Sequence, residues 1–305
     1  MKKITKVGLS ALAGALAISS ANAGEVSISG AMEITYITGS GYQDTGNGFG
    51  QDNEFTITAS TELDNGTSVA YKRTVNESFA GNDSELSFGT TFGTIAMTSA
   101  GSPISAIDDK TPTAFEEANA QVGSIDDVNG MDGTFGVRYT LADVMGSGMS
   151  LDAMWSPVHG TGDTHGDQGS SVAHGNGDAV EVTLTGSVPM VEGLSLGIGY
   201  ANLEEIRDYT GTVGASTDDQ DEGTGYITYA YGPFTAGYQV SAVSVGTSNT
   251  LYKTEYIGLS YSVSDNLSVS YNTIESDRTA QDGLVTEQEF DSFSVGYSMG
   301  GPIVG

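Results

Sequence analysis

The chain has 305 residues, with 39 acidic against 10 basic side chains and a formal net charge of −29. A field of this sign repels phosphate backbones and excludes nucleic acid as a partner, and the absence of cysteine excludes disulfide frameworks and thiolate metal sites. The 43 glycines, 15 tyrosines and 10 phenylalanines, set against only 6 prolines, indicate many short strands joined by glycine-containing turns.

Residues 1–23 have the layout of a secretory signal peptide. Lysines open the segment, a mostly apolar run covers residues 7–18, and Ala21-Asn22-Ala23 has the small-x-small pattern of a cleavage site. The apolar run is too short for a helix that crosses a bilayer core of about 30 Å, which needs roughly 20 residues. We therefore predict export, cleavage after Ala23 and a mature chain of residues 24–305.

The mature chain is dominated by an alternation of apolar side chains with serine, threonine, glycine and charged ones. Clear examples lie at 26–36, 55–59, 180–184, 194–200, 234–242 and 257–263. Successive side chains of a strand face opposite sides, so each segment has one apolar and one polar face. We count about fourteen such strands and no long apolar run. In lipid only helices and closed barrels satisfy their backbone hydrogen bonds.

The connections alternate between tight and long. Tight turns at 64–66, 232–233 and 264–266 are interspersed with polar stretches at 38–53, 100–133, 158–178, 202–223 and 275–289. Short turns at one rim, long loops at the other and polar faces turned inward are typical of outer-membrane barrels. Aromatic residues near strand ends, such as Trp155, Tyr200, Tyr231, Tyr271 and Tyr297, would form interfacial girdles. We predict an all-β fold, a transmembrane antiparallel up-and-down β-barrel.

Several segments, in this order, resemble the Gram-negative general porin family. They are the leader end Ala21-Asn22-Ala23, the opening strand at 24–30, the turn Leu63-Asp64-Asn65-Gly66-Thr67, and the strand-turn-strand at 86–95. The resemblance covers essentially the whole chain and implies a homotrimeric barrel of sixteen strands in the outer membrane of a Gram-negative cell. Barrels of this membrane usually end in an aromatic residue, whereas this chain ends in Gly305. We expect residues 24–305 to lack about the last two strands.

The resemblance also implies a long loop, folded into the pore, at residues 100–133. The loop carries the acidic residues Asp108, Asp109, Glu116 and Glu117. Thr113 with Glu116 is a capping-box pattern and predicts a short helix over 114–121. If the loop enters the pore, the four carboxylates would line the constriction and favour cations. The alternative is that these acids only solvate an external loop.

Facing the acidic loop, members of the family carry a basic cluster on the barrel wall. In this chain two residues suit that role, Lys72 and Arg138, because the alternation puts both on polar faces. The same alternation puts Arg73 on the lipid face. With only two candidates the transverse field would be weak and the pore net negative, which predicts a preference for cations.

The sequence offers little evidence for a metal site or a catalytic site. Three histidines, at 159, 165 and 174, have spacings that match no metal-binding pattern, and the acids at 218–222 lack the surroundings of a calcium loop. There is no phosphate-binding glycine loop with a following lysine, and all three histidines lie in a loop, which argues against a catalytic triad. We expect no enzyme activity, no metal site and no cofactor.

The sequence therefore predicts a porin that lets ions and small polar solutes diffuse passively across the outer membrane, with the lipid bilayer and further copies of the chain as its partners. Two alternatives remain open at this point. One is a substrate-selective channel on the same fold, which would need a ladder of aromatic or basic residues inside. The other is a surface adhesive β-protein stabilised by calcium, which would leave the apolar strand faces unexplained.

Overall fold

A computed structural model describes residues 14–15, 25–36, 49–76, 81–114, 128–159, 176–205 and 219–297. The chain divides into two compact units, Met1–Thr90 with Ser298–Gly305, and Thr91–Tyr297. In the described residues the regular structure is antiparallel β, apart from three short 3₁₀ helices, η2 (Ser105–Ile107), η3 (Val144–Gly146) and η4 (Gly246–Ser248). None of the described helices has the length and apolarity needed to cross a bilayer.

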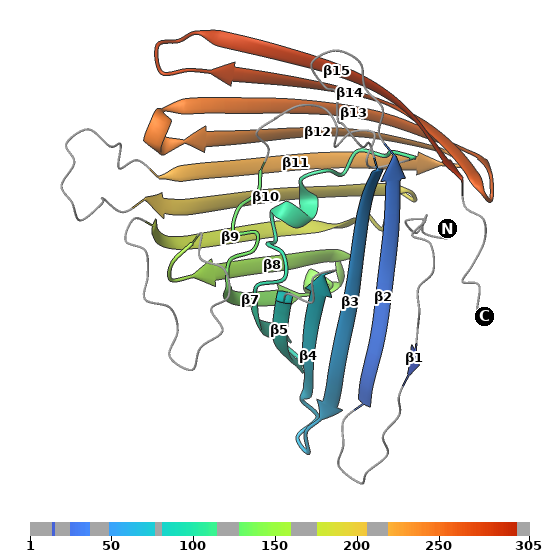
Figure 1. Ribbon diagram of the computed structural model, residues 1–305, viewed down its shortest axis with the longest axis vertical. Coiled ribbons are helices and arrows are strands. Elements are labelled where there is room, and N and C mark those ends of the chain that lie inside the picture. The colour runs from blue at the N-terminus through green and yellow to red at the C-terminus, as the bar shows by residue number, and fades with distance from the viewer. Residues whose placement is uncertain are drawn as a thin grey trace. The chain divides into compact units, whose positions relative to one another are not determined.

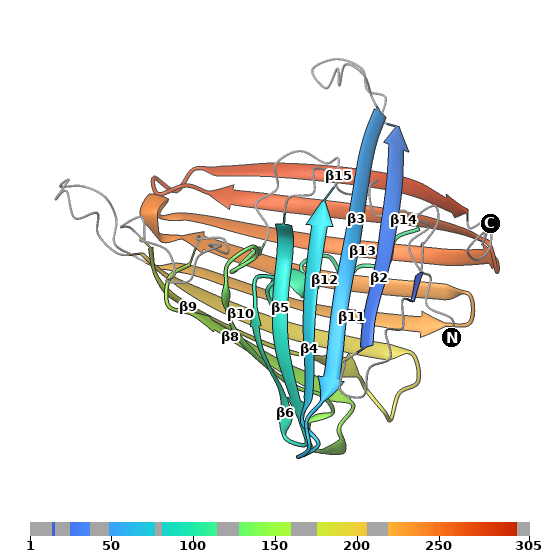
Figure 2. The ribbon, with the colours of Figure 1, turned by 60° about the horizontal axis from the view of Figure 1, so that its bottom comes forward.

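The first unit is an antiparallel meander (Figure 2). Its strands are β2 (Glu25–Tyr36), β3 (Phe49–Glu62), β4 (Ser68–Asn76) and β5 (Gly81–Thr90), and each pairs with the next. A two-residue strand, β1 (Gly14–Ala15), pairs with β2 from within the predicted leader. The rest of residues 1–23 lies outside the described residues.

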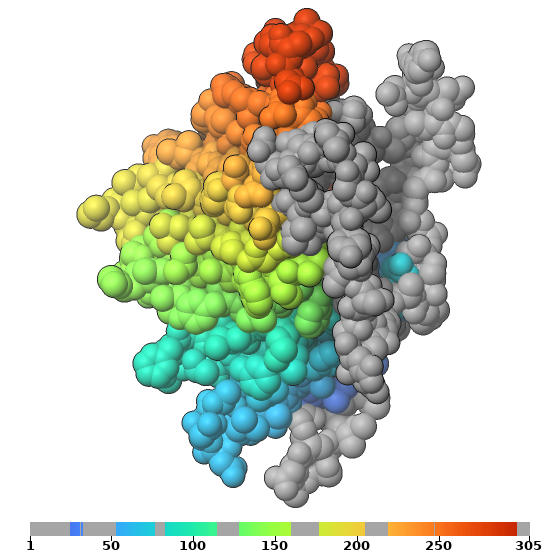
Figure 3. All heavy atoms as spheres, turned by 90° about the vertical axis from the view of Figure 1, so that its left-hand side faces the viewer, coloured from blue at the N-terminus to red at the C-terminus, as the bar shows by residue number. Residues whose placement is uncertain are grey.

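Figure 1 shows the second unit as a ribbon, and Figure 3 shows one side of it as spheres coloured from teal to red. This unit continues the same pattern over ten strands. They are β6 (Gly93–Thr98), β7 (Gly136–Leu141), β8 (Met149–Ser156), β9 (Asn176–Ser187), β10 (Leu194–Glu205), β11 (Gln220–Tyr231), β12 (Phe234–Val245), β13 (Thr250–Ser264), β14 (Leu267–Thr279) and β15 (Val285–Tyr297). Each pairs antiparallel with its neighbours in the chain. After residue 24 the described part thus has fourteen strands, β2 to β15, as the sequence predicts.

The two faces of these strands are inverted relative to a soluble protein. On β13, β14 and β15, Leu259, Tyr271 and Phe293 stand opposite one another and are exposed. On the other face, Ser270 and Ser294 stand opposite each other and are buried, with their hydroxyls 2.6 Å apart. We call these the apolar face and the polar face. Strands with lipid on one side and a polar interior on the other need this arrangement.

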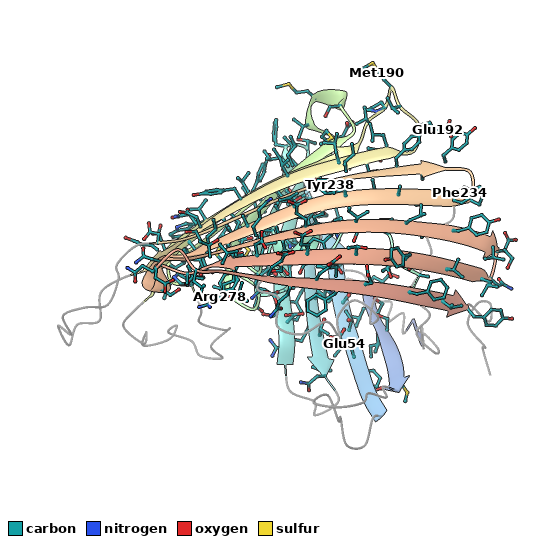
Figure 4. The ribbon with its side chains drawn as sticks, turned by 90° about the horizontal axis from the view of Figure 1, so that it is seen from above. Glu54, Met190, Glu192, Phe234, Tyr238 and Arg278 are labelled. Carbon is teal, nitrogen blue, oxygen red and sulfur yellow. The ribbon has the colours of Figure 1, made fainter. Side chains whose placement is uncertain are left out.

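Strand length and aromatic placement agree with a membrane span. Strands β9 to β15 have 12 to 15 residues, whereas a transmembrane strand needs about 9–11. In Figure 4, Phe234 marks the short-turn end of these strands and Arg278 the opposite end, with Tyr238 between them. Phe234 packs against Tyr261, with ring centroids 4.7 Å apart, next to the turn at 232–233.

Four aromatic donors on the apolar face each bond a carboxylate on the following strand. The pairs are Trp155 Nε1 to Asp178 Oδ2 (3.2 Å), Tyr200 OH to Asp221 Oδ1 (2.5 Å), Tyr238 OH to Glu255 Oε2 (2.8 Å) and Tyr271 OH to Asp291 Oδ1 (2.7 Å). Such side chains have an apolar ring and a polar tip, which suits the boundary between hydrocarbon and water. These pairs therefore mark the edge of the lipid-facing zone on the second unit.

One predicted loop is wrong. Residues 275–289 are not a long polar stretch, because β14 continues to Thr279 and β15 begins at Val285. The turn between them repeats the hydrogen bonds of the turn at 63–67, with a glycine at positive φ in the same place: Gly283 (φ 81°) corresponds to Gly66 (φ 80°). A turn that ends with a left-handed residue selects Asn-Gly or Asp-Gly. The Asp282-Gly283 pair was the signal for this hairpin.

Candidate functional site

The long connection between β6 and β7 lies against the polar face of the second unit. The structure describes its first part, to residue 114, and its last part, from residue 128. Hydrogen bonds link the loop in turn to β9, β11, β12 and β14, and Figure 1 shows η2 and the adjoining chain in front of β9 and β10. The loop thus crosses the strands instead of leaving the sheet.

Glu181 on β9 binds both ends of the loop. Its Oε2 accepts a hydrogen bond from the backbone N–H of Ile104 (3.2 Å), and its Oε1 accepts one from the backbone N–H of Met131. The side chain is fully buried. The two oxygens of a carboxyl group can each accept a hydrogen bond. One side chain therefore fixes two loop segments at the same point of the wall.

Glu222 on β11 reinforces this attachment. Its Oε2 accepts from the backbone N–H groups of Asn129 and Gly130, each at 2.7 Å, and the residue is 2% exposed. Ala201 on the intervening strand stands opposite both Glu181 and Glu222, and its small side chain leaves room for the loop. The two carboxylates form one row, which we call the carboxylate clamp.

Gln239 on β12 holds the loop just beyond η2. Its Oε1 accepts from the backbone N–H of Lys110 (2.7 Å), while its Nε2 donates to the carbonyls of Ile107 (2.8 Å) and Asp108 (2.7 Å). The same Nε2 lies 2.9 Å from Thr224 Oγ1 on β11. Gln239 is fully buried, and three of the four hydrogen-bond contacts of its amide are to the backbone of residues 107–110.

Further along, the loop runs close to the backbone of the wall. Asn272 Nδ2 donates to the carbonyl of Pro112 (3.1 Å), and the backbone N–H of Ala114 donates to Ser270 Oγ (2.9 Å). A Cβ added to Gly237 would lie 2.5 Å from Pro112 Cδ. This close approach explains why a residue without a side chain occupies that position of β12.

Apolar packing supports the polar attachments. A buried cluster joins loop and wall: Ile104, Val128, Met131, Met154, Ala179, Ala201, Leu203 and Val243. Full burial of a side chain such as Ile104 or Met131 stabilises by about 1.5–3 kcal/mol. The loop is thus packed onto the polar face by its own hydrophobic side chains.

The structure describes two of the four acidic residues that the sequence places in the constriction. Asp108 is half-buried and Asp109 is exposed, and both follow η2 directly. The Lys110 ammonium lies 3.6 Å from the Asp109 carboxylate, which reduces the local negative charge. Glu116 and Glu117, with the predicted helix that contains them, lie outside the described residues.

The predicted basic residues belong to different units. Arg138 on β7 shares its face with the buried Ala96 and Met154, and its Nη1 is 3.5 Å from the carbonyl of Ala100 at the start of the loop. Lys72 lies in the first unit, on the face of β4 that carries Thr74, and directly opposite Glu85. The register places Arg73 on the opposite face, beside Ile57.

Sequence reasoning missed Arg278 as a residue of the polar face. It lies on β14 opposite Tyr252, with Nε 3.2 Å from the tyrosine hydroxyl and the guanidinium 6.0 Å from the ring centroid. The assignment of 275–289 to a loop hid it. The polar faces that carry Glu181, Glu222 and Gln239 were visible in the alternation, but nothing in the sequence indicated their loop partners.

The histidines offer no metal site in the described part of the chain. His159 is buried, and its Nε2 lies 2.9 Å from the carbonyl of Glu204. His165 and His174 lie outside the described residues. Among the side chains that the structure describes, no group of three or more histidine, aspartate or glutamate residues could hold a metal ion.

The inverted faces, the antiparallel meander and the loop held against the polar face define a transmembrane up-and-down β-barrel of the outer membrane. The family model for Gram-negative porins matches residues 8–299. The chain therefore belongs to the Gram-negative porin family, and it is an outer-membrane channel protein. A comparison with curated protein sequences finds no match.

Solved outer-membrane proteins share this fold at low sequence identity. In its trimer form, OmpT of Vibrio cholerae is similar with a TM-score of 0.61 and 12% identity, over 92% of this chain and 85% of that one. A loop L8 deletion mutant of OmpT gives 0.59 and 12%, over 92% and 90%. OmpF of Salmonella typhi, in complex with daunomycin, gives 0.55 and 12%, over 91% and 87%. At this identity the likeness concerns the fold alone.

Proposed function

We propose that this porin is a general diffusion channel that prefers cations, with the loop at 100–133 as its constriction. The observation that carries the proposal is the attachment of the loop to the polar face through the carboxylate clamp and Gln239. A loop on the polar face of a membrane barrel narrows the aqueous path. Permeation is passive, involves no catalytic step and needs no cofactor.

The charge on the proposed pathway supports the cation preference. Asp108 and Asp109 are carried by the attached part of the loop, and Glu116 and Glu117 belong to the same proposed constriction. In the described part of the second unit, the basic side chains of the polar face and loop are Arg138, Arg278 and Lys110. Carboxylates in a narrow pore favour cations. Lys72 and Arg138 are the proposed basic wall residues.

The test is the reversal potential of membrane-extracted protein in a planar bilayer under a KCl gradient. A perfectly cation-selective pore reverses at about 59 mV for a tenfold gradient, and we expect a value of that sign but smaller. Reversal toward the chloride potential would overturn the cation preference and leave the porin. A current that saturates with one solute would instead indicate a substrate-selective channel.

A loop deletion tests the constriction itself. Replacing residues 105–128 by a short glycine-serine linker should raise single-channel conductance, because the segment held by Gln239 and Asn272 would be gone. Unchanged conductance in a variant that still inserts into membranes would remove the loop from this role. Deletion within the predicted external stretch 206–218, which has no proposed role in the constriction, serves as the control.

The proposal extends to processing and assembly. We propose that residues 1–23 direct export and are removed after Ala23, and that the mature chain forms a homotrimer, as the trimer form of OmpT suggests by its likeness in fold. N-terminal sequencing of the membrane protein tests the first point, with Gly24 expected. Chemical cross-linking in membranes tests the second, and products no larger than one chain would contradict the trimer.

A further inference from the structure

The acidic residues of the proposed constriction can select cations only if the loop presents them in a fixed orientation. In the described part of the loop, Asp108 and Asp109 directly follow η2, a single turn of 3₁₀ helix, and such turns are marginal by themselves. Something outside the loop must therefore hold the backbone at 107–110.

Gln239 satisfies three backbone groups on this short stretch. It donates to the carbonyls of Ile107 and Asp108 and accepts from the N–H of Lys110, all at 2.7–2.8 Å. These groups bracket the two acidic residues on both sides. The orientation of Asp109, whose side chain is exposed, is thus tied to one buried amide.

The surroundings of Gln239 keep that amide in place. Its cross-strand neighbours are Tyr226 on β11 and Tyr256 on β13, and its Nε2 is also within 2.9 Å of Thr224 Oγ1. The hydroxyl of Thr224 is in turn 3.0 Å from Ser241 Oγ. The amide therefore sits in a hydrogen-bonded network, in which a fixed rotamer is favoured over a mobile one.

We propose that Gln239 is the positioning residue for charge selection, acting through the backbone of residues 107–110 and not by contact with the permeating ion. This rests on the proposed function. Holding the loop here needs a donor for the two carbonyls and an acceptor for the N–H group. Only an amide of this length presents both together. A carboxylate presents acceptors only and would oppose two carbonyl oxygens, while an apolar side chain presents neither.

The first experiment compares Gln239→Met with the wild type in planar bilayers. The methionine variant keeps similar volume but loses all three loop bonds, so reversal should shift toward the chloride potential and open-channel current noise should rise. The matched control is Gln288→Met, since Gln288 lies exposed on the polar face of β15 opposite Ser276. The control should match the wild type in both readouts.

A second variant separates positioning from general structural damage. At alkaline pH, where its carboxyl is ionised, Gln239→Glu should behave like the methionine variant, because a carboxylate presents acceptors only. At acidic pH its carboxylic acid can donate to one loop carbonyl and accept from Lys110 N–H, so its noise and selectivity should return to those of the wild type at the same pH. The nearby titratable groups, Tyr226, Tyr256, Lys110 and the loop acids, are common to both proteins. Gln239→Met should show no such return.

The outcomes separate the two proposals. A wild type without current, or with anion preference, defeats the proposed function itself. A cation-preferring wild type with an indistinguishable Gln239→Met variant defeats only the role of Gln239. If Gln239→Met fails to insert, the glutamate variant decides between the outcomes. Loss at alkaline pH with return at acidic pH supports the positioning role, whereas wild-type behaviour at alkaline pH, or no return at acidic pH, overturns it.

Discussion

The carboxylate clamp makes a prediction that depends on which oxygen atom bonds which N–H group. Glu181 uses both oxygens, one for Ile104 and the other for Met131. Glu222 uses a single oxygen for both of its loop N–H groups. Replacing each by glutamine changes a carboxyl to an amide in the same row, but only Glu181→Gln must turn an amide NH₂ toward a loop N–H.

The size of the expected effect on loop attachment follows from placing an amide NH₂ against a loop N–H group. A buried donor left without an acceptor costs about 1–3 kcal/mol. This cost applies only while the loop is attached, because a detached loop can bond water. It therefore shifts the equilibrium from the attached toward the detached loop by roughly 5–150-fold. Glu222→Gln can keep its oxygen toward the loop, and its new NH₂ group then faces Gln220, which can turn its own amide to accept. Its loop should stay attached.

Single-channel recording measures the effect. Glu181→Gln should show brief excursions to a different conductance, more frequent than in the wild type by a factor within the stated range, while Glu222→Gln should resemble the wild type. Because both variants replace a carboxyl by an amide at adjacent positions, a simple field effect would act on both in the same direction. Equal behaviour of the two variants would refute the clamp as the cause of loop attachment.

Three further changes have distinct expected results. Asp109→Asn should move the reversal potential toward that of chloride, because it removes an exposed carboxylate from the proposed constriction; an unchanged potential would exclude Asp109 from selection. Gly237→Val should displace the loop and alter conductance, since even a Cβ there would lie 2.5 Å from Pro112 Cδ; wild-type conductance would contradict the close approach. Tyr238→Phe loses the hydrogen bond to Glu255 on the apolar face. It should reduce the free energy of unfolding by about 0.5–1.5 kcal/mol, measured as a lower thermal midpoint. Conductance is the control and should stay unchanged.

The strands could be predicted because each is specified by the alternation of neighbouring side chains. Alternation places Glu181 between Val180 and Val182, and that pattern is enough to give strand and face. Turn chemistry is local too, as the Asn65-Gly66 turn demonstrates. The hairpin at 280–284 differs from the prediction although Asp282-Gly283 carries the same signal, because acidic residues on either side give the segment the composition of a polar loop. They extend the strands instead.

The loop required the tertiary structure. Glu181 and Ile104 are 77 residues apart, and Gln239 and Lys110 are 129 apart. No local pattern relates residues at such separations, and only the resemblance to the porin family implies where the loop lies. The same holds for Arg278, whose place on the polar face depends on how far β14 extends.

The sequence by itself determined the strands, their apolar and polar faces and most of the tight turns, because side-chain alternation and turn residues are patterns of a few neighbouring residues. Only the tertiary structure decided which buried side chains hold the loop. That choice depends on pairing backbone N–H and C=O groups that would otherwise be buried without partners, and such pairing is settled between strands and loop in space, not along the chain.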